Sequence, residues 1–137
     1  MPEIGRYAKR PRPESVRAME RALETHTAVA GVERINDHTL LIQRTGNRPS
    51  VRMYLTNIYT LGAADVDEIL AEDPAANLIV SVSLWNSFTG SAKATAAERG
   101  VGLFKFGEAL GAINYVGARF LKYTLPDSND KQRKRAG

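Results

Sequence analysis

The stretch NLIVSVSL, residues 77–84, decides the fold. Nearly every position is apolar and several are β-branched, which is typical of a strand covered on both faces of a sheet. Residues 91–99 follow as a helix of small residues that stops at Gly100, and residues 101–106 form a second apolar strand. A crossover of this length makes the two strands parallel neighbours, and we expect residues 77–84 at the centre of the sheet.

The segments before this unit predict one helix and three antiparallel strands. A helix is expected from Pro13, because Val16, Met19 and Leu23 recur on one face and charged residues occupy the others. Asn36 and Asp37 favour a hairpin turn, and apolar residues alternate with polar ones after the turn formers at 45–49. The expected strands are residues 32–35, 38–43 and 51–56.

Two further helices complete the domain. A short helix follows Asp65, with Glu68 in a capping-box-like position, and Pro74 closes it. A last helix is expected over 108–123, and its glycines indicate close packing against a neighbour. We therefore predict an α/β fold with a mixed sheet, in which antiparallel front strands precede a parallel β-α-β-α unit and helices cover both faces.

Composition excludes several classes of protein. The chain has 137 residues, 43% of them hydrophobic, which suits a single domain with a real core. Because it has no cysteine, it has no disulfide, no thiolate zinc site and no cysteine nucleophile. The first residues do not resemble a signal peptide, and no apolar run approaches the roughly 20 residues of a membrane helix. We expect a cytoplasmic protein without a membrane partner.

The net charge of +4 is unevenly distributed along the chain. Residues 1–12 carry four basic residues against one acid, and residues 131–137 carry four basic residues and no acid. The intervening chain is therefore slightly acidic, with a net charge of −3. We expect a basic flexible arm at 1–13, a single α/β domain at 14–123 and a basic disordered tail at 124–137. Such ends either contact phosphate or simply keep the protein soluble.

The loop after the first apolar strand is the best ligand candidate. It joins the carboxyl end of a strand to a helix amino terminus, where open α/β sheets bind ligands and free N–H groups attract anions. The alternative is that a hydroxyl of this loop only caps the helix while Trp85 and Phe88 close over the core. The candidate ligand or phosphate contacts are Asn86, Ser87, Thr89, Ser91 and Lys93.

No pattern indicates a metal or a cofactor. His26 and His38 lack the spacing of metal ligands, so a core or surface role is expected for both. The acids at 65–73 are explained by the start of a helix, where the dipole favours negative charge. The GxxxxGK[ST] and GxGxxG phosphate-binding motifs and the nucleophile elbow are all absent.

Residues 78–83, 88–93, 99–104 and 107–110 are similar to the strand, polar loop, helix, strand and closing helix of the restriction-endonuclease-like PD-(D/E)XK nuclease superfamily. The predicted order of elements, helix, two or three antiparallel strands, helix, strand, helix, strand, helix, also resembles that of the superfamily. The resemblance implies an acid on the second strand and a (D/E)XK triplet on the third, which hold Mg²⁺. Residues 39–43 contain no acid, and 51–57 contain neither acid nor lysine. Glu20 or Glu24 matches the acid that some members carry on the first helix.

Three functions are compatible with these patterns. The first is a catalytically degenerate nuclease-like domain that associates with nucleic acid through basic arms. The second is a protein-interaction or structural subunit, including a homo-oligomer. The third is an enzyme, either one that uses the polar loop at 85–93 or a metal-dependent nuclease with a displaced active site. Under the first, the expected contacts are Arg10, Arg12, Arg44, Arg48, Arg52, Tyr54, Trp85, Arg133, Lys134 and Arg135.

Overall fold

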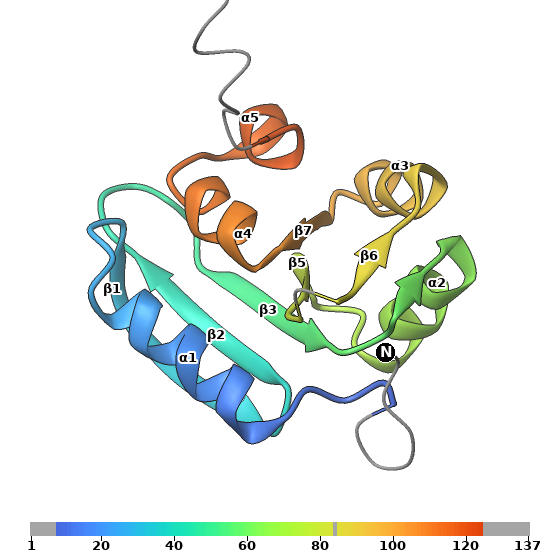
Figure 1. Cartoon of the computed structure of the whole chain (residues 1–137). Coiled ribbons are helices and arrows are strands. Elements are labelled where there is room, and N and C mark those ends of the chain that lie inside the picture. Colours follow the sequence, from blue (N-terminus) through green and yellow to red (C-terminus); the bar gives the residue numbers. More distant parts are fainter. Residues whose placement is uncertain (1–7, 84, 125–137) are drawn as a thin grey trace, which may run out of the picture.

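The apolar strands at 78–81 and 102–105 extend a sheet whose first half is antiparallel (Figure 1). The computed structural model describes residues 8–83 and 85–124, and within them five strands pair in the order β1-β2-β3-β5-β7. Strands β1 to β3 are antiparallel, whereas β3, β5 and β7 are parallel, so the predicted mixed sheet is confirmed. The strands are β1 (Val29–Asn36), β2 (Thr39–Arg44), β3 (Val51–Thr56), β5 (Leu78–Ser81) and β7 (Gly102–Lys105).

Strand β5 is buried at every position, as its apolar sequence predicts. It lies between β3 and β7, so that Val80 is opposite Leu55 on one side and Phe104 on the other. The middle strand of the sheet is nevertheless β3, because β1 and β2 add to one side while β5 and β7 add to the other. The expectation that residues 77–84 form the central strand is therefore wrong, because β5 lies next to the central strand β3.

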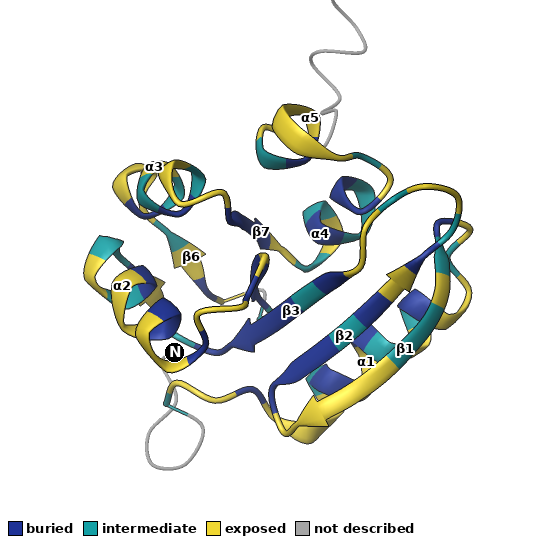
Figure 2. Ribbon diagram, turned by 180° about the vertical axis from the view of Figure 1, so that it is seen from behind, coloured by how far each residue is buried: buried dark blue, intermediate teal, exposed yellow. Residues whose placement is uncertain are grey.

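Helices cover both faces of the sheet, as expected, and each face has its own core (Figure 2). Helix α1 (Pro13–Glu24) and helix α4 (Phe106–Ala112) pack on one face. Helix α2 (Ala63–Glu72) and helix α3 (Gly90–Glu98) pack on the other. None of the described helices is long and apolar enough to cross a membrane.

A second, two-stranded sheet was not expected from the sequence. Strands β4 (Thr60–Leu61) and β6 (Ser87–Phe88) pair in parallel. The Ser87 backbone N–H donates to the Tyr59 carbonyl at 2.9 Å, and the Thr89 N–H donates to the Leu61 carbonyl at 3.0 Å. These bonds hold the loop after β5 against the segment that follows β3.

The last helix is interrupted, which corrects the continuous helix expected over 108–123. Helix α4 ends at Ala112, and a separate short helix α5 spans Gly117–Leu121. Gly117 has a positive φ of 61°, which a helix interior does not accommodate but glycine adopts freely. The guanidinium of Arg44 donates to the carbonyls of Ile113 and Tyr115, at 3.0 and 2.7 Å, and so satisfies the backbone at the break.

Close packing at a glycine positions the end of the described chain. A Cβ on Gly111 of α4 would clash with the Tyr123 side chain, at its hydroxyl oxygen and its Cζ. Tyr123 in turn stacks on Tyr115, with ring centroids 5.7 Å apart and planes inclined by 28°. The close packing expected from the glycines of this region is therefore confirmed at Gly111, where it allows Tyr123 to approach the helix.

Substituting Gly111→Ala should destabilise the protein by about 1–3 kcal/mol, because the added methyl must displace the Tyr123 ring. Chemical denaturation monitored by circular dichroism measures this change. Gly90→Ala is the matched control, since nothing lies within 4 Å of a Cβ there and alanine is the better helix former. Equal stabilities of the two variants would contradict the packing of Tyr123 on α4.

Candidate nucleic-acid interface

Two of the arginines expected to contact phosphate form hydrogen bonds with other groups of the protein. Arg44 is 9% exposed and, besides its bonds at the helix break, donates from Nε to the Pro49 carbonyl at 2.7 Å. Arg52 donates from Nε to both carboxylate oxygens of Asp73, at 2.9 and 3.0 Å. Arg44 lies on β2 and Arg52 on the adjacent strand β3. Their donors serve the fold, because buried polar groups need partners of their own.

Arg48, in the turn between β2 and β3, contacts the segment between α4 and α5. Its Nε donates to the Asn114 carbonyl at 3.0 Å, and a terminal nitrogen donates to the Thr45 carbonyl at 3.0 Å. The side chain is half-buried and fixed beside the segment that joins α4 to α5. Arg48 therefore contributes positive charge to the surface around Tyr115, one residue after Asn114.

Of the two aromatic residues expected to stack on bases, one is buried and one is exposed. Tyr54 is 7% exposed and donates its hydroxyl to Glu72 Oε2 at 3.1 Å, so its ring is not accessible to a base. Trp85 is 73% exposed and does not close over the core. Tyr59, which the sequence did not single out, is 43% exposed.

Polar side chains of the candidate ligand loop form hydrogen bonds with neighbouring groups of the protein. The Thr89 hydroxyl accepts from the Ala92 N–H at 3.0 Å as the N-cap of α3, and it lies 3.2 Å from the hydroxyl of Ser91. Asn86 is buried and donates to Asn57 Oδ1 at 2.9 Å. The capping role that was the alternative for this loop is thus what Thr89 performs, while Ser87 is exposed on β6.

Lys93 lies against β7 at the outer edge of the sheet. Its Nζ donates to the Leu103 carbonyl at 2.6 Å and lies 3.7 Å from the centroid of the Phe104 ring. Burial lowers the pKa of Lys93, with Glu108 acting in the opposite direction. Strand β7 is the last strand of the sheet, and a lysine at such an edge discourages pairing with another chain.

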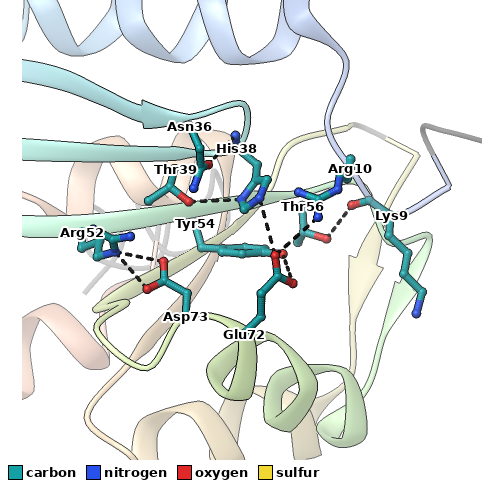
Figure 3. Close-up of polar contacts among 10 residues, drawn as sticks. All are labelled: Lys9, Arg10, Asn36, His38, Thr39, Arg52, Tyr54, Thr56, Glu72 and Asp73. Atoms are coloured by element: carbon teal, nitrogen blue, oxygen red, sulfur yellow. Dashed lines mark hydrogen bonds and ion pairs between the residues drawn. The ribbon is translucent and has the colours of Figure 1, made fainter.

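The described end of the basic arm is attached to the carboxyl end of β3 (Figure 3). The Lys9 carbonyl accepts from the Thr56 hydroxyl at 3.0 Å and from the Asn57 N–H at 2.7 Å. Lys9 Nζ pairs with Glu68 at 3.3 Å on the surface. Arg12 is exposed immediately before α1. Residues 1–7, and the tail with Arg133, Lys134 and Arg135, lie outside the described residues.

Beside this attachment, Glu72 accepts from or pairs with three groups that are distant in sequence (Figure 3). Tyr54 bonds one carboxylate oxygen, and the other lies 3.5 Å from Arg10 and 3.6 Å from His38 Nε2. His38 is 7% exposed, its Nδ1 lies 3.1 Å from the Thr39 hydroxyl, and its ring packs 4.7 Å from that of Tyr54. No local motif indicates this cluster, because its members come from different elements.

Burial determines the protonation of the cluster. It lowers the pKa of His38, and the charge of Arg10 adds to that effect against the carboxylates of Glu72, Asp37 and Asp73. Burial and the neighbouring Glu72 raise the pKa of Tyr54 to about 12. The imidazole is therefore neutral and the phenol protonated near neutral pH. The cluster is a hydrogen-bonded hub that joins the arm, the hairpin and α2.

A cleft of about 180 Å³ between the arm, β3 and α2 has the wrong charge for phosphate. Its lining includes two cations, Lys9 and Arg10, and three carboxylates, those of Asp65, Glu68 and Glu72. Asp65 accepts from the Gly62 N–H at 2.8 Å and so serves the start of α2. Repulsion between phosphate and three carboxylates outweighs the attraction of two cations that are already paired.

A second hollow, at α5, has the opposite character. It has a volume of about 380 Å³ and is lined by Tyr115, Ala118, Arg119, Lys122 and Tyr123. We call it the α5 basic pocket. Among the described residues, the lining contains two cations, two tyrosines and no carboxylate. In the sequence the signal is weak, since these residues occur in a segment that looks like one continuous amphipathic helix.

The described residues offer no obvious metal centre. Among them no three histidine or acidic side chains are grouped so as to hold a metal ion. Strands β2 and β3 carry no carboxylate where the nuclease resemblance requires them. Glu20 of α1, the helix acid of that resemblance, forms an ion pair with Arg34 of β1.

Comparison with known proteins does not add to this picture. No protein-family model, no curated protein and no solved structure matches the chain. Function is therefore inferred from the charges, burial and ring geometry described above.

The free energy of unfolding should decrease as the pH is lowered below 6.5, the ordinary pKa of His38. Because the folded state lowers this pKa, the stabilising effect of the neutral imidazole is complete above 6.5 and is lost as the pH falls. Denaturation curves between about pH 7.5 and about pH 5.5 measure it, above the range in which carboxylates titrate.

His38→Gln is the comparison, because an amide retains polarity without titrating in this range. Its free energy of unfolding should depend less on pH than that of the unmodified chain. Arg10→Gln should also reduce the dependence, since removing that charge lets the pKa of His38 rise toward its ordinary value. Parallel pH curves for all three proteins would contradict the role of His38.

Proposed function

We propose that this chain is a nuclease-like domain that lacks metal-dependent cleavage and associates with nucleic acid. The contact surface is the α5 basic pocket, with Arg48 beside it. The basic tail, with Arg133, Lys134 and Arg135, follows this surface in the sequence and adds further phosphate contacts. The nuclease-like part of the proposal rests on the resemblance carried by residues 78–83, 88–93, 99–104 and 107–110.

The supporting observation for nucleic-acid binding is a pair of exposed cations without acidic partners. Within the described part of the chain, Arg119 and Lys122 form no salt bridge, and the pocket between them contains no carboxylate. Cations that are not neutralised internally can replace the counterions of phosphate, which is the main source of affinity for nucleic acids. Arg119 and Lys122 therefore carry the proposal.

The amino-terminal arm contributes less. Lys9 and Arg10 pair with Glu68 and Glu72, so a phosphate must compete with carboxylates for them. These pairs are exposed, and pairs of that kind are worth no more than about 1 kcal/mol. We therefore assign the arm a secondary role and the α5 surface the principal one.

Binding of a fluorescently labelled oligonucleotide, measured by anisotropy, should weaken steeply with salt. The logarithm of the association constant should fall with the logarithm of salt concentration, with a slope of about 0.7 to 0.9 for each phosphate neutralised. The double variant Arg119→Gln/Lys122→Gln should bind more weakly. Its slope should be smaller by about one for each phosphate that the variant no longer neutralises.

Arg17→Gln/Arg21→Gln is the matched control, because it removes two exposed charges from α1, which lies away from α5 in both views (Figures 1 and 2). We expect little change in its slope. A flat salt response of the unmodified chain would exclude the proposed function, and equal weakening in both double variants would show that only net charge matters.

The proposal also predicts that supercoiled plasmid remains intact in Mg²⁺ or Mn²⁺. Strands β2 and β3 lack the carboxylates that would bind the one or two metal ions of a nuclease. Agarose gels with the purified chain test this. Nicking that is abolished in Glu20→Ala or Glu24→Ala, and retained in Glu14→Ala, would show instead that α1 carries an active site.

A further inference from the structure

Three planar groups contact one another in pairs at the α5 basic pocket. The rings of Tyr123 and Tyr115 stack with centroids 5.7 Å apart. The guanidinium carbon of Arg119 lies 4.7 Å from the centroid of the Tyr115 ring, in a cation–π contact. Tyr123 approaches α4 closely because Gly111 has no side chain. These contacts run from Gly111 of α4 through the two tyrosines to the exposed Arg119, and we call the three groups the Tyr123-Tyr115-Arg119 column.

The two tyrosines of the column are held by contacts with the rest of the fold. Arg44 holds the carbonyl of Tyr115, and Phe104 packs edge-on against Tyr123 with centroids 6.5 Å apart. Packing of this kind reduces the side-chain entropy that a ligand would otherwise have to overcome. The arrangement therefore suits a planar ligand that extends the stack, rather than one that merely neutralises charge.

The adjoining space and charge identify the kind of ligand. The pocket of about 380 Å³ is large enough for a small planar group, within the usual range of ligand sites. Lys122 lines the same pocket and offers a cation to a group beside the plane. A planar, uncharged ring joined to an anion is the description of a base with its phosphate.

We propose that the α5 basic pocket selects single-stranded over double-stranded nucleic acid by stacking one base on the Tyr123-Tyr115-Arg119 column, with Lys122 on the adjacent phosphate. In a duplex the base faces are covered by their neighbours, whereas an unpaired strand can turn a base toward an aromatic ring or guanidinium plane. This inference rests on the proposed function and adds the class of nucleic acid to it.

The experiment compares four labelled probes of one mixed sequence: single-stranded DNA, single-stranded RNA, and the duplex of each. Dissociation constants are measured by anisotropy with the full chain at one salt concentration. Both single strands should bind more tightly than either duplex. A preference between DNA and RNA would tell which strand is the natural ligand, since stacking alone serves both.

The variant Tyr115→Leu should weaken single-strand binding roughly five- to hundredfold, the range for replacing an aromatic side chain of a base-stacking platform. Its duplex binding should be nearly unchanged, because the cations remain. Tyr115→Phe should bind like the unmodified chain, since the ring is kept and only the hydroxyl is removed. Tyr59→Leu removes an exposed tyrosine from another part of the molecule and should have little effect.

Each alternative outcome has its own meaning. Salt-dependent binding of duplex and single strand with equal affinity would overturn the inference and leave the proposed function standing. Absence of binding to every probe would overturn both. If Tyr115→Leu weakened binding to single strands and duplexes equally, the stacking role would be overturned, because the ring would then act by holding Arg119 or by stabilising the fold. Circular dichroism of the variant would distinguish these two roles.

Discussion

The buried guanidinium of Arg44 is the constraint on which the α5 surface depends. It connects β2 to the Pro49 turn and to the carbonyls of Ile113 and Tyr115, where α4 has ended and α5 has not begun. Burial lowers its pKa, and Arg48 acts in the same direction, yet an arginine retains its charge in proteins. Leaving such a charge without these acceptors would strongly destabilise the fold.

Charge on this molecule is divided between cations that serve the fold and cations that face outward. Arg44, Arg52 and Lys93 are bound to carbonyls or to a carboxylate and organise strands β2, β3 and β7. Arg119 and Lys122 line the α5 basic pocket, to which no carboxylate contributes within residues 8–83 and 85–124. A net charge does not distinguish these two groups, because it takes no account of the partner of each cation.

The functional candidates show where sequence patterns stop. Thr89 could be expected as an N-cap from its place before a run of small residues, and it is one. Arg52 and Tyr54 looked like surface residues of an alternating strand, but α2 covers that face and gives them Asp73 and Glu72 as partners. The Tyr115-Tyr123 pair was hidden within an apparently continuous helix, whose break depends on Arg44, some 70 residues earlier in the chain.

The sequence alone determined the elements whose signals are local. The apolar run that became β5, the helix and second strand after it, and the amphipathic α1 follow from periodicity and from capping residues nearby. Tertiary structure decided which cations are paired inside, where the last helix breaks, and that Glu72 gathers Arg10, His38 and Tyr54. The physical reason is that burial and hydrogen-bond partners depend on contacts between distant segments, which no local pattern records.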